Sequence, residues 1–212
     1  MKKMCLPLAF GVLCFASAPA RAQQQLAVPP MSNPPVTYGY DLKPQAVFDL
    51  DQAGQKFVDL ATAIPAEKYS YRPAPGVRSI GEVYLHVTAA NYLFLEALSS
   101  PAPAKYKAKD WETSITNKDA IIAELRQSFA NAHAVMEKVS TTDIAKPMTQ
   151  FGPEAVEGDL EYGMVTHLHE HLGQSIAYAR AVGVTPPWTA AAEAAAKKKA
   201  AGGKPADGPK PE

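Results

Sequence analysis

The segment PQAVFDLDQAGQKFVDLATAI, residues 44–64, has a clear helical pattern. Its apolar residues recur every three or four positions, which is the spacing of one face of an α-helix. Pro44 suits the first turn of a helix, and Pro65 cannot continue one. The predicted inner face consists of Val47, Leu50, Gly54, Phe57, Val58, Ala61 and Ile64. An apolar face of this length predicts a helix that packs against other helices.

Three further segments have the same helical period. We expect these helices over residues 80–99, 118–139 and 160–182. Ser79 and Glu82 form a capping-box pattern at the start of the first of them, while Asp159 precedes the last and Gly183 follows it. With no strand pattern and no internal repeat, the sequence predicts an all-α four-helix bundle. The long connection between the second and third helices is expected to cross over the bundle.

The first 22 residues have the layout of a secretory signal. Lys2 and Lys3 precede an apolar run at residues 6–15, and small residues end the segment at Ala20-Arg21-Ala22. We therefore expect cleavage before Gln23 and export to the periplasm or out of the cell. The apolar run is shorter than the ~20 residues that a bilayer requires, so no membrane span is expected.

The rest of the chain divides by composition. Residues 23–40, rich in Pro, Gln and Asn, are expected to be a flexible linker. Residues 41–188 contain the periodic segments and are long enough for one domain with a full core. Residues 189–212 are mostly Ala, Lys, Gly, Pro and Glu, so this segment buries no core and is predicted to be a disordered tail.

Charge and cysteine content exclude some classes of function. Without Lys2, Lys3 and Arg21, 18 of the 21 basic residues remain against 21 acidic ones, a net charge of −3. This balance argues against a nucleic-acid partner. Cys5 and Cys14 both lie in the predicted signal, so the mature chain has no disulfide and no cysteine metal ligand.

The last predicted helix carries histidines at metal-ligand spacing. In His167-Leu168-His169-Glu170-His171, the first and last imidazoles lie one turn apart on the same face. His169 is about 200° from His167 around the axis, so it is not expected to be a ligand. His86, on the apolar stripe of the second helix, is expected to supply the third ligand. Three imidazoles would hold a divalent ion, zinc first and nickel among the alternatives, with positions left open for water or a small molecule.

Two polar residues lie beside these predicted ligands. Glu82, one turn before His86, could orient that imidazole, join the metal's ligands or act as a general base, or it could serve only to cap the helix. Gln174, three residues after His171, could hydrogen-bond a ligand or a bound molecule, or it could serve helix packing.

Three kinds of function fit these residues. The open three-histidine site suggests a metal-dependent transferase or hydrolase that acts on an unidentified small molecule. A non-catalytic module would bind and release metal at the three histidines, or use the metal to tie the second and fourth helices together. A structural site of this kind would need a fourth protein ligand, for which Glu82 is the one candidate. The pattern H-x-x-E-H also matches inverted zinc peptidases, with Glu170 as the base, but that class needs a further carboxylate well downstream, where only the tail remains.

Two motifs resemble the DinB-like and YfiT-like metal-binding four-helix-bundle proteins over residues 41–188. The first consists of IPAEKYSYRP (64–73), VRSIGE (77–82) and His86, and is similar to that family's entry into its second helix. The second consists of HLHEHLGQ (167–174), RAVG (180–183) and Pro186-Pro187, and is similar to the family's last helix.

The resemblance implies a divalent metal, often zinc or nickel, on His86, His167 and His171, commonly in a homodimer. Some relatives are S-transferases or isomerases that use bacillithiol or mycothiol at the metal. Those thiol cofactors belong to the cytoplasm, so the predicted export argues against thiol transfer here. Leu172 stands where the family commonly has a basic residue, and that residue's contacts are not expected in this chain.

Overall fold

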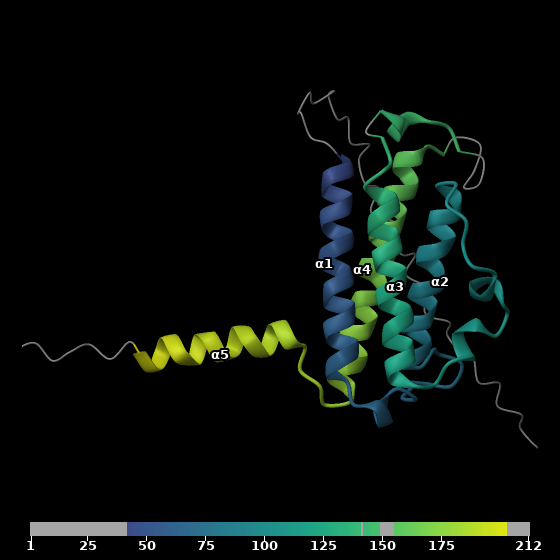
Figure 1. Cartoon of the computed structure of the whole chain (residues 1–212). Helices are drawn as coiled ribbons and strands as arrows, with labels where there is room; N and C mark the ends of the chain where they lie inside the picture. Colours follow the sequence, from purple (N-terminus) through teal and green to yellow (C-terminus); the bar gives the residue numbers. More distant parts are fainter. Residues whose placement is uncertain (1–41, 141, 149–154, 203–212) are drawn as a thin grey trace, which may run out of the picture. The chain divides into compact units, whose positions relative to one another are not determined.

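The computed structural model describes residues 42–202 except 141 and 149–154 (Figure 1). The predicted signal and linker lie outside these residues. The α-helices are α1 (Leu42–Ala63), α2 (Ile80–Ala97), α3 (Lys118–Met136), α4 (Glu157–Ala181) and α5 (Pro187–Gly202). Short 3₁₀ segments are η1 (Ala66–Lys68), η2 (Ala104–Lys107), η3 (Trp111–Thr113) and η4 (Asp143–Ala145). The described residues contain no strand, only an isolated bridge between Pro147 and Val156.

Helices α1 to α4 form the predicted bundle (Figure 1). Both α1 and α2 pack against α3 and α4, so α1 and α2 lie diagonally opposite each other. The Lys118 ammonium at the start of α3 donates to the Ile64 carbonyl just after α1, which makes these two helices antiparallel. The first turns of α2 and α3 meet at Gly81 and Ile121, which makes this pair parallel.

The parallel pair requires a connection that runs the length of the bundle. Residues 98–117, which contain η2 and η3, make this predicted crossover and pack along α2 (Figure 1). Trp111 anchors it, since its side chain is buried and its indole Nε1 donates to the Leu85 carbonyl at 2.9 Å. The crossover is therefore docked against the middle of α2.

The core consists of the faces that the periodicity predicted. All seven residues of the predicted inner face are buried, six of them in α1 and Ile64 just after it. Gly54 allows a close approach to α3, because a Cβ atom there would lie 2.8 Å from Cδ1 of Phe129. The Phe129 ring in turn stacks on Phe57 at a centroid distance of 5.8 Å. Glycine at this position thus sets the separation of α1 and α3.

Local hydrogen bonds explain where the helices begin and end. The predicted capping box of α2 is present, with the Ser79 hydroxyl accepting from the Glu82 amide and the Glu82 carboxylate accepting from the Ser79 amide. Gly183, at φ 84°, ends α4 as predicted, and its amide donates to the Arg180 carbonyl. The start of α4 differs from the prediction. Asp159 lies inside the first turn, where its carboxylate accepts from the Val156 amide.

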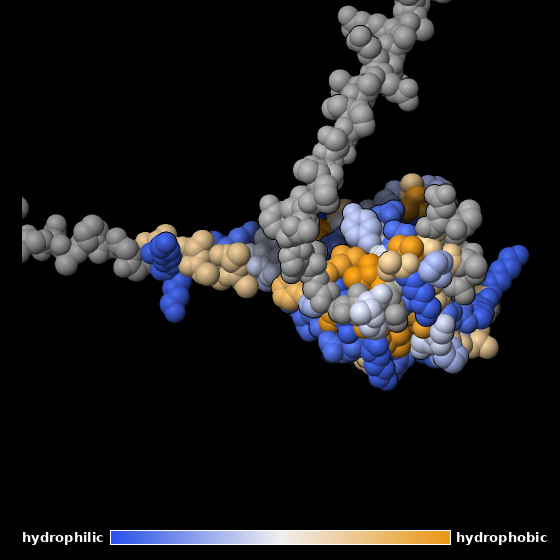
Figure 2. Space-filling model, turned by 90° about the horizontal axis from the view of Figure 1, so that it is seen from above, coloured by the Kyte–Doolittle hydropathy of each residue, from blue (hydrophilic) through white to orange (hydrophobic). Residues whose placement is uncertain are grey.

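Helix α5 differs from the prediction of a disordered tail. The model has a helix over Pro187–Gly202, although the side chains from Ala190 to Ala201 are exposed, as expected for a segment that buries no core. Alanine and lysine dominate its surface, and these residues have high intrinsic helix propensity (Figure 2). The local preference of the backbone is therefore helical even without packing. Of the helices in the described part of the chain, none combines the length and apolarity needed to cross a membrane.

Candidate metal centre

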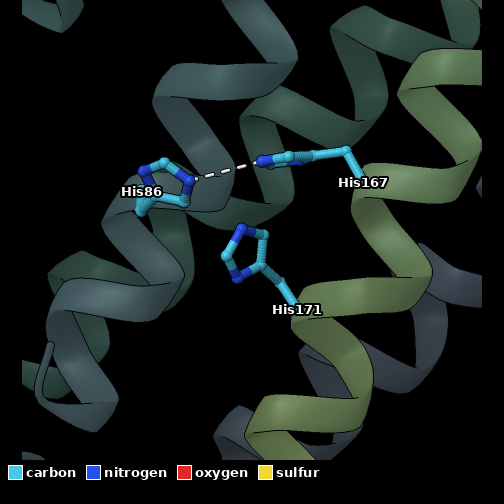
Figure 3. A group of neighbouring side chains, drawn as sticks. All are labelled: His86, His167 and His171. Atoms are coloured by element: carbon cyan, nitrogen blue, oxygen red, sulfur yellow. Dashed lines mark hydrogen bonds between the residues drawn. The ribbon is translucent and has the colours of Figure 1, made fainter. Parts of the chain in front are cut away.

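Three histidines from two helices come together inside the bundle. His86 lies on α2, and His167 and His171 lie one turn apart on α4, with all three rings pointing toward one another (Figure 3). The Nε2 atoms of His86 and His167 are 3.3 Å apart. One nitrogen from each ring lies within 4.8 Å of the other two. His171 is buried, and the other two rings are half-buried, so this group could hold a metal ion.

Glu112 fixes the orientation of His86. Its Oε1 atom lies 2.7 Å from the Nδ1 atom of His86, and Arg78 binds the same carboxylate from Nε and Nη2 at 2.5 and 3.0 Å. Burial raises the pKa of Glu112, but the hydrogen bonds from Arg78 and His86 outweigh this effect and lower it below its ordinary value. The carboxylate only accepts, so Nδ1 of His86 carries the proton and Nε2 has a free lone pair.

Gln174 fixes the orientation of His171. Its Oε1 atom lies 2.8 Å from the Nδ1 atom of His171, while its Nε2 atom donates to the Tyr178 hydroxyl at 3.0 Å. An amide oxygen only accepts, so the proton of His171 is on Nδ1 and its Nε2 is unprotonated. Gln174 therefore lies behind a histidine of the group, as one of its two sequence interpretations proposed.

The surroundings of the rings favour their neutral form. Burial lowers the pKa of His167 to about 4, and the charges of His171, His86 and Arg78 act in the same direction. Burial also lowers the pKa of His86, and this effect outweighs the opposing effect of the hydrogen bond that His86 donates to Glu112. Both rings are neutral at neutral pH, which is the form that binds metals. The Nδ1 atom of His167 is buried without a hydrogen-bond partner among the described residues.

Other residues singled out from the sequence lie apart from this group. The Glu82 carboxylate is engaged by the Ser79 amide and by the Arg72 guanidinium, an arrangement that matches its capping interpretation. His169 is exposed, as its position on the far side of the helix predicts. Glu170 is exposed as well, which gives the peptidase interpretation no support.

Glu112 is a site residue that the sequence did not predict. It lies on η3 in the crossover, 26 residues after His86, where no periodicity relates it to a helix face. The one local signal is Trp111, because a tryptophan in a proline-rich connection indicates a segment that docks against the core. That signal would place the neighbouring side chain near α2 without identifying its partner.

The fold is a helical bundle with a three-histidine group between α2 and α4. Comparison with known proteins shows the family to which the chain belongs. The DinB superfamily matches residues 49–175, and the chain belongs to this superfamily. The fold is similar to that of a DinB-like protein from Bacillus cereus ATCC 10987, with a TM-score of 0.59 and 16% sequence identity over 68% of this chain and 95% of that one. No curated protein matches the chain.

Proposed function

We propose that this DinB protein binds one divalent metal ion through Nε2 of His86, His167 and His171. The observation that carries the proposal is that hydrogen bonds to Glu112 and Gln174 leave two of these atoms unprotonated and directed at the same point (Figure 3). Zinc–imidazole bonds of about 2.0–2.1 Å in a tetrahedron separate two ligand nitrogens by about 3.3 Å. The 3.3 Å between His86 and His167 matches that separation.

We further propose that the site is open and acts on a small molecule, as a transferase or hydrolase. A bound zinc or nickel ion supplies Lewis acidity that polarises a donor group of that molecule. Glu112 and Gln174 orient the rings of His86 and His171 through hydrogen bonds to their Nδ1 atoms. A closed structural site would need a fourth ligand, and Glu82, the candidate from the sequence, is already engaged by Arg72 and Ser79.

Metal analysis of the purified chain tests this proposal. We expect about one equivalent of zinc or nickel in the wild type, and loss of that metal in His86→Ala, His167→Ala and His171→Ala. His169→Ala is the matched control and should retain the metal, because its side chain lies on the exposed face of α4. A folded wild-type protein that binds no metal, or equal loss in all four variants, would overturn the proposal.

We also propose that the protein is exported, on the basis of residues 1–22. Mass spectrometry of the protein recovered from cell fractions should find a chain that begins at Gln23 outside the cytoplasm. Recovery of the uncut chain in the cytoplasm would contradict export while leaving the proposed metal site unaffected.

A further inference from the structure

An open pocket of about 340 Å³ lies beside the histidine group. Both His86 and His167 line it, together with the C-terminal half of α2 and the crossover. Ala89 and Ala90 of α2 make the room, because their side chains end at Cβ. His86 and His167 belong both to the pocket lining and to the histidine group, so the pocket adjoins the proposed metal site.

The walls of the pocket are aromatic and fixed by packing. Tyr106, from the crossover, is buried and stacks on Tyr92 with ring centroids 4.0 Å apart. The edge of Phe94 meets the His167 ring at a centroid distance of 5.8 Å. The first contact packs the crossover against α2, and the second places one wall of the pocket directly against a histidine of the group.

Charge is confined to the edge of the pocket. Lys107 and Glu96, which both line it, form an ion pair of 2.6 Å. Because the two charges offset each other, this edge does not select for a charged group. The interior offers only apolar contact apart from the imidazoles. Small-molecule sites have volumes of roughly 300–1,000 Å³, and this pocket lies near the lower end of that range.

From this juxtaposition we infer that the pocket binds the apolar part of a small organic molecule whose donor group is bound at the three histidines. The occupant is amphiphilic, with a medium-length acyl chain or a single aromatic ring in the pocket and a metal-binding group at one end. The inference rests on the proposed metal binding, and it adds the chemical class of the molecule that the site takes.

Two hydroxamates that differ only in chain length test this inference. The full-length mature protein, loaded with zinc, is titrated calorimetrically with acetohydroxamate and with octanohydroxamate. Each fully buried methylene contributes about fourfold in affinity. Because the pocket is open and buries only part of the chain, we expect octanohydroxamate to bind at least tenfold more tightly. Metal content is measured before and after the titration, so that loss of zinc to the hydroxamate is detected.

A pocket-filling variant locates the effect. Ala89→Leu places extra side-chain volume in the pocket at a half-buried helix position. It should reduce the advantage of octanohydroxamate to threefold or less, with zinc content and acetohydroxamate affinity unchanged. Ala123→Leu is the matched control on the exposed face of α3 and should retain the full advantage. Circular dichroism verifies that both variants fold.

The outcomes separate this inference from the proposed function. Equal affinities for the two hydroxamates in zinc-loaded wild type would overturn the inference and leave the metal site standing. If octanohydroxamate still binds Ala89→Leu tenfold more tightly than acetohydroxamate, its alkyl chain lies outside this pocket. That result would also overturn the inference. Failure of the wild type to bind either zinc or nickel is a separate result, which overturns the proposed function and this inference together.

Discussion

Glu112 is the side chain that ties the crossover to the histidine group. It accepts from Nδ1 of His86 and is itself held by Arg78, so the orientation of the ring depends on a residue outside the bundle helices. Carboxylates behind ligating histidines commonly strengthen metal binding by orienting the ring and raising its basicity. Metal affinity should therefore depend on a residue that does not touch the metal.

Replacement of this carboxylate tests its effect on affinity. Glu112→Gln should weaken zinc binding by about 10–100-fold, because a neutral amide is a weaker acceptor for the His86 ring. Competition with a chromophoric chelator measures the change. Glu170→Gln, which alters an exposed carboxylate on α4, should have no effect. Unchanged affinity in Glu112→Gln would mean that Arg78 and packing suffice to orient His86.

At this scale the sequence predicted the histidines but only part of their support. The spacing of His167 and His171 places them on one helix face, and His169 on the other, because the helical period alone fixes those directions. Gln174 could be proposed for the same reason, since it lies one turn from His171. Glu112 could not, because its contact with His86 depends on how the crossover docks, and no local pattern encodes that docking.

Among the elements, α1 and α3 show how one residue sets the separation of two helices. The Phe129 ring packs so closely on Gly54 that there is no room for a Cβ atom at this position. A glycine inside a helix normally costs about 1 kcal/mol relative to alanine. The close packing of the Phe129 ring on Phe57 offsets this cost.

A pair of glycine substitutions separates packing from helix propensity. Gly54→Ala should lower the free energy of unfolding by about 1–2 kcal/mol, because overpacking outweighs the gain in propensity. Gly173→Ala, on the exposed face of α4 with open space at its Cβ position, should raise it by about 0.5–1 kcal/mol. Urea denaturation measures both. Stabilisation by Gly54→Ala would show that the Phe129 ring moves aside at little cost.

The elements themselves were largely predictable, with two exceptions that have physical causes. The helical period of the apolar residues predicted the four helix faces, and the length of the connection predicted the crossover. The structure contains all of these. Asp159 lies inside α4 because aspartate is favourable both as a cap and within the first turn, so its presence does not fix the first residue. Helix α5 was missed because the absence of a core indicates disorder, whereas the alanine-rich composition favours a helix.

For the whole molecule, the histidine group joins segments far apart in the chain. His86 and His167 are separated by 81 residues, and a metal between them would link α2 to α4. A ligand that binds only the folded state stabilises it by about 4 kcal/mol at 1,000 times its dissociation constant. The bundle should therefore be more stable with metal than without it.

Metal removal tests this linkage. Treatment of the wild type with a chelator should lower its urea midpoint, whereas the midpoint of His86→Ala should not change. Added zinc should restore the original urea midpoint of the wild type. A wild-type midpoint that is the same with and without the chelator would mean that no metal contributes to stability.

Helix α5 should contribute little to the stability of the bundle. Its side chains from Ala190 to Ala201 are exposed, while Trp188 packs against the core and lies under the Lys56 ammonium at 5.9 Å. A chain that ends at Thr189 should have a free energy of unfolding within about 0.5 kcal/mol of that of the full chain. Trp188→Ala, which removes the core contact, should be destabilising by more than this, as measured by urea denaturation. A large loss on truncation would show that α5 has a packed partner.

The directions of α1 and α4 restrict how this chain can be circularly permuted. Because α3 is antiparallel to α1 and parallel to α2, and Gly163 near the start of α4 faces Phe94 near the end of α2, α1 and α4 run in the same direction (Figure 1). The bundle therefore begins at one end and finishes at the other. With 22 residues, α1 spans about 33 Å. A circular permutant that joins the end of α4 to the start of α1 needs a linker of at least about ten extended residues, and a two-residue linker would force the bundle open.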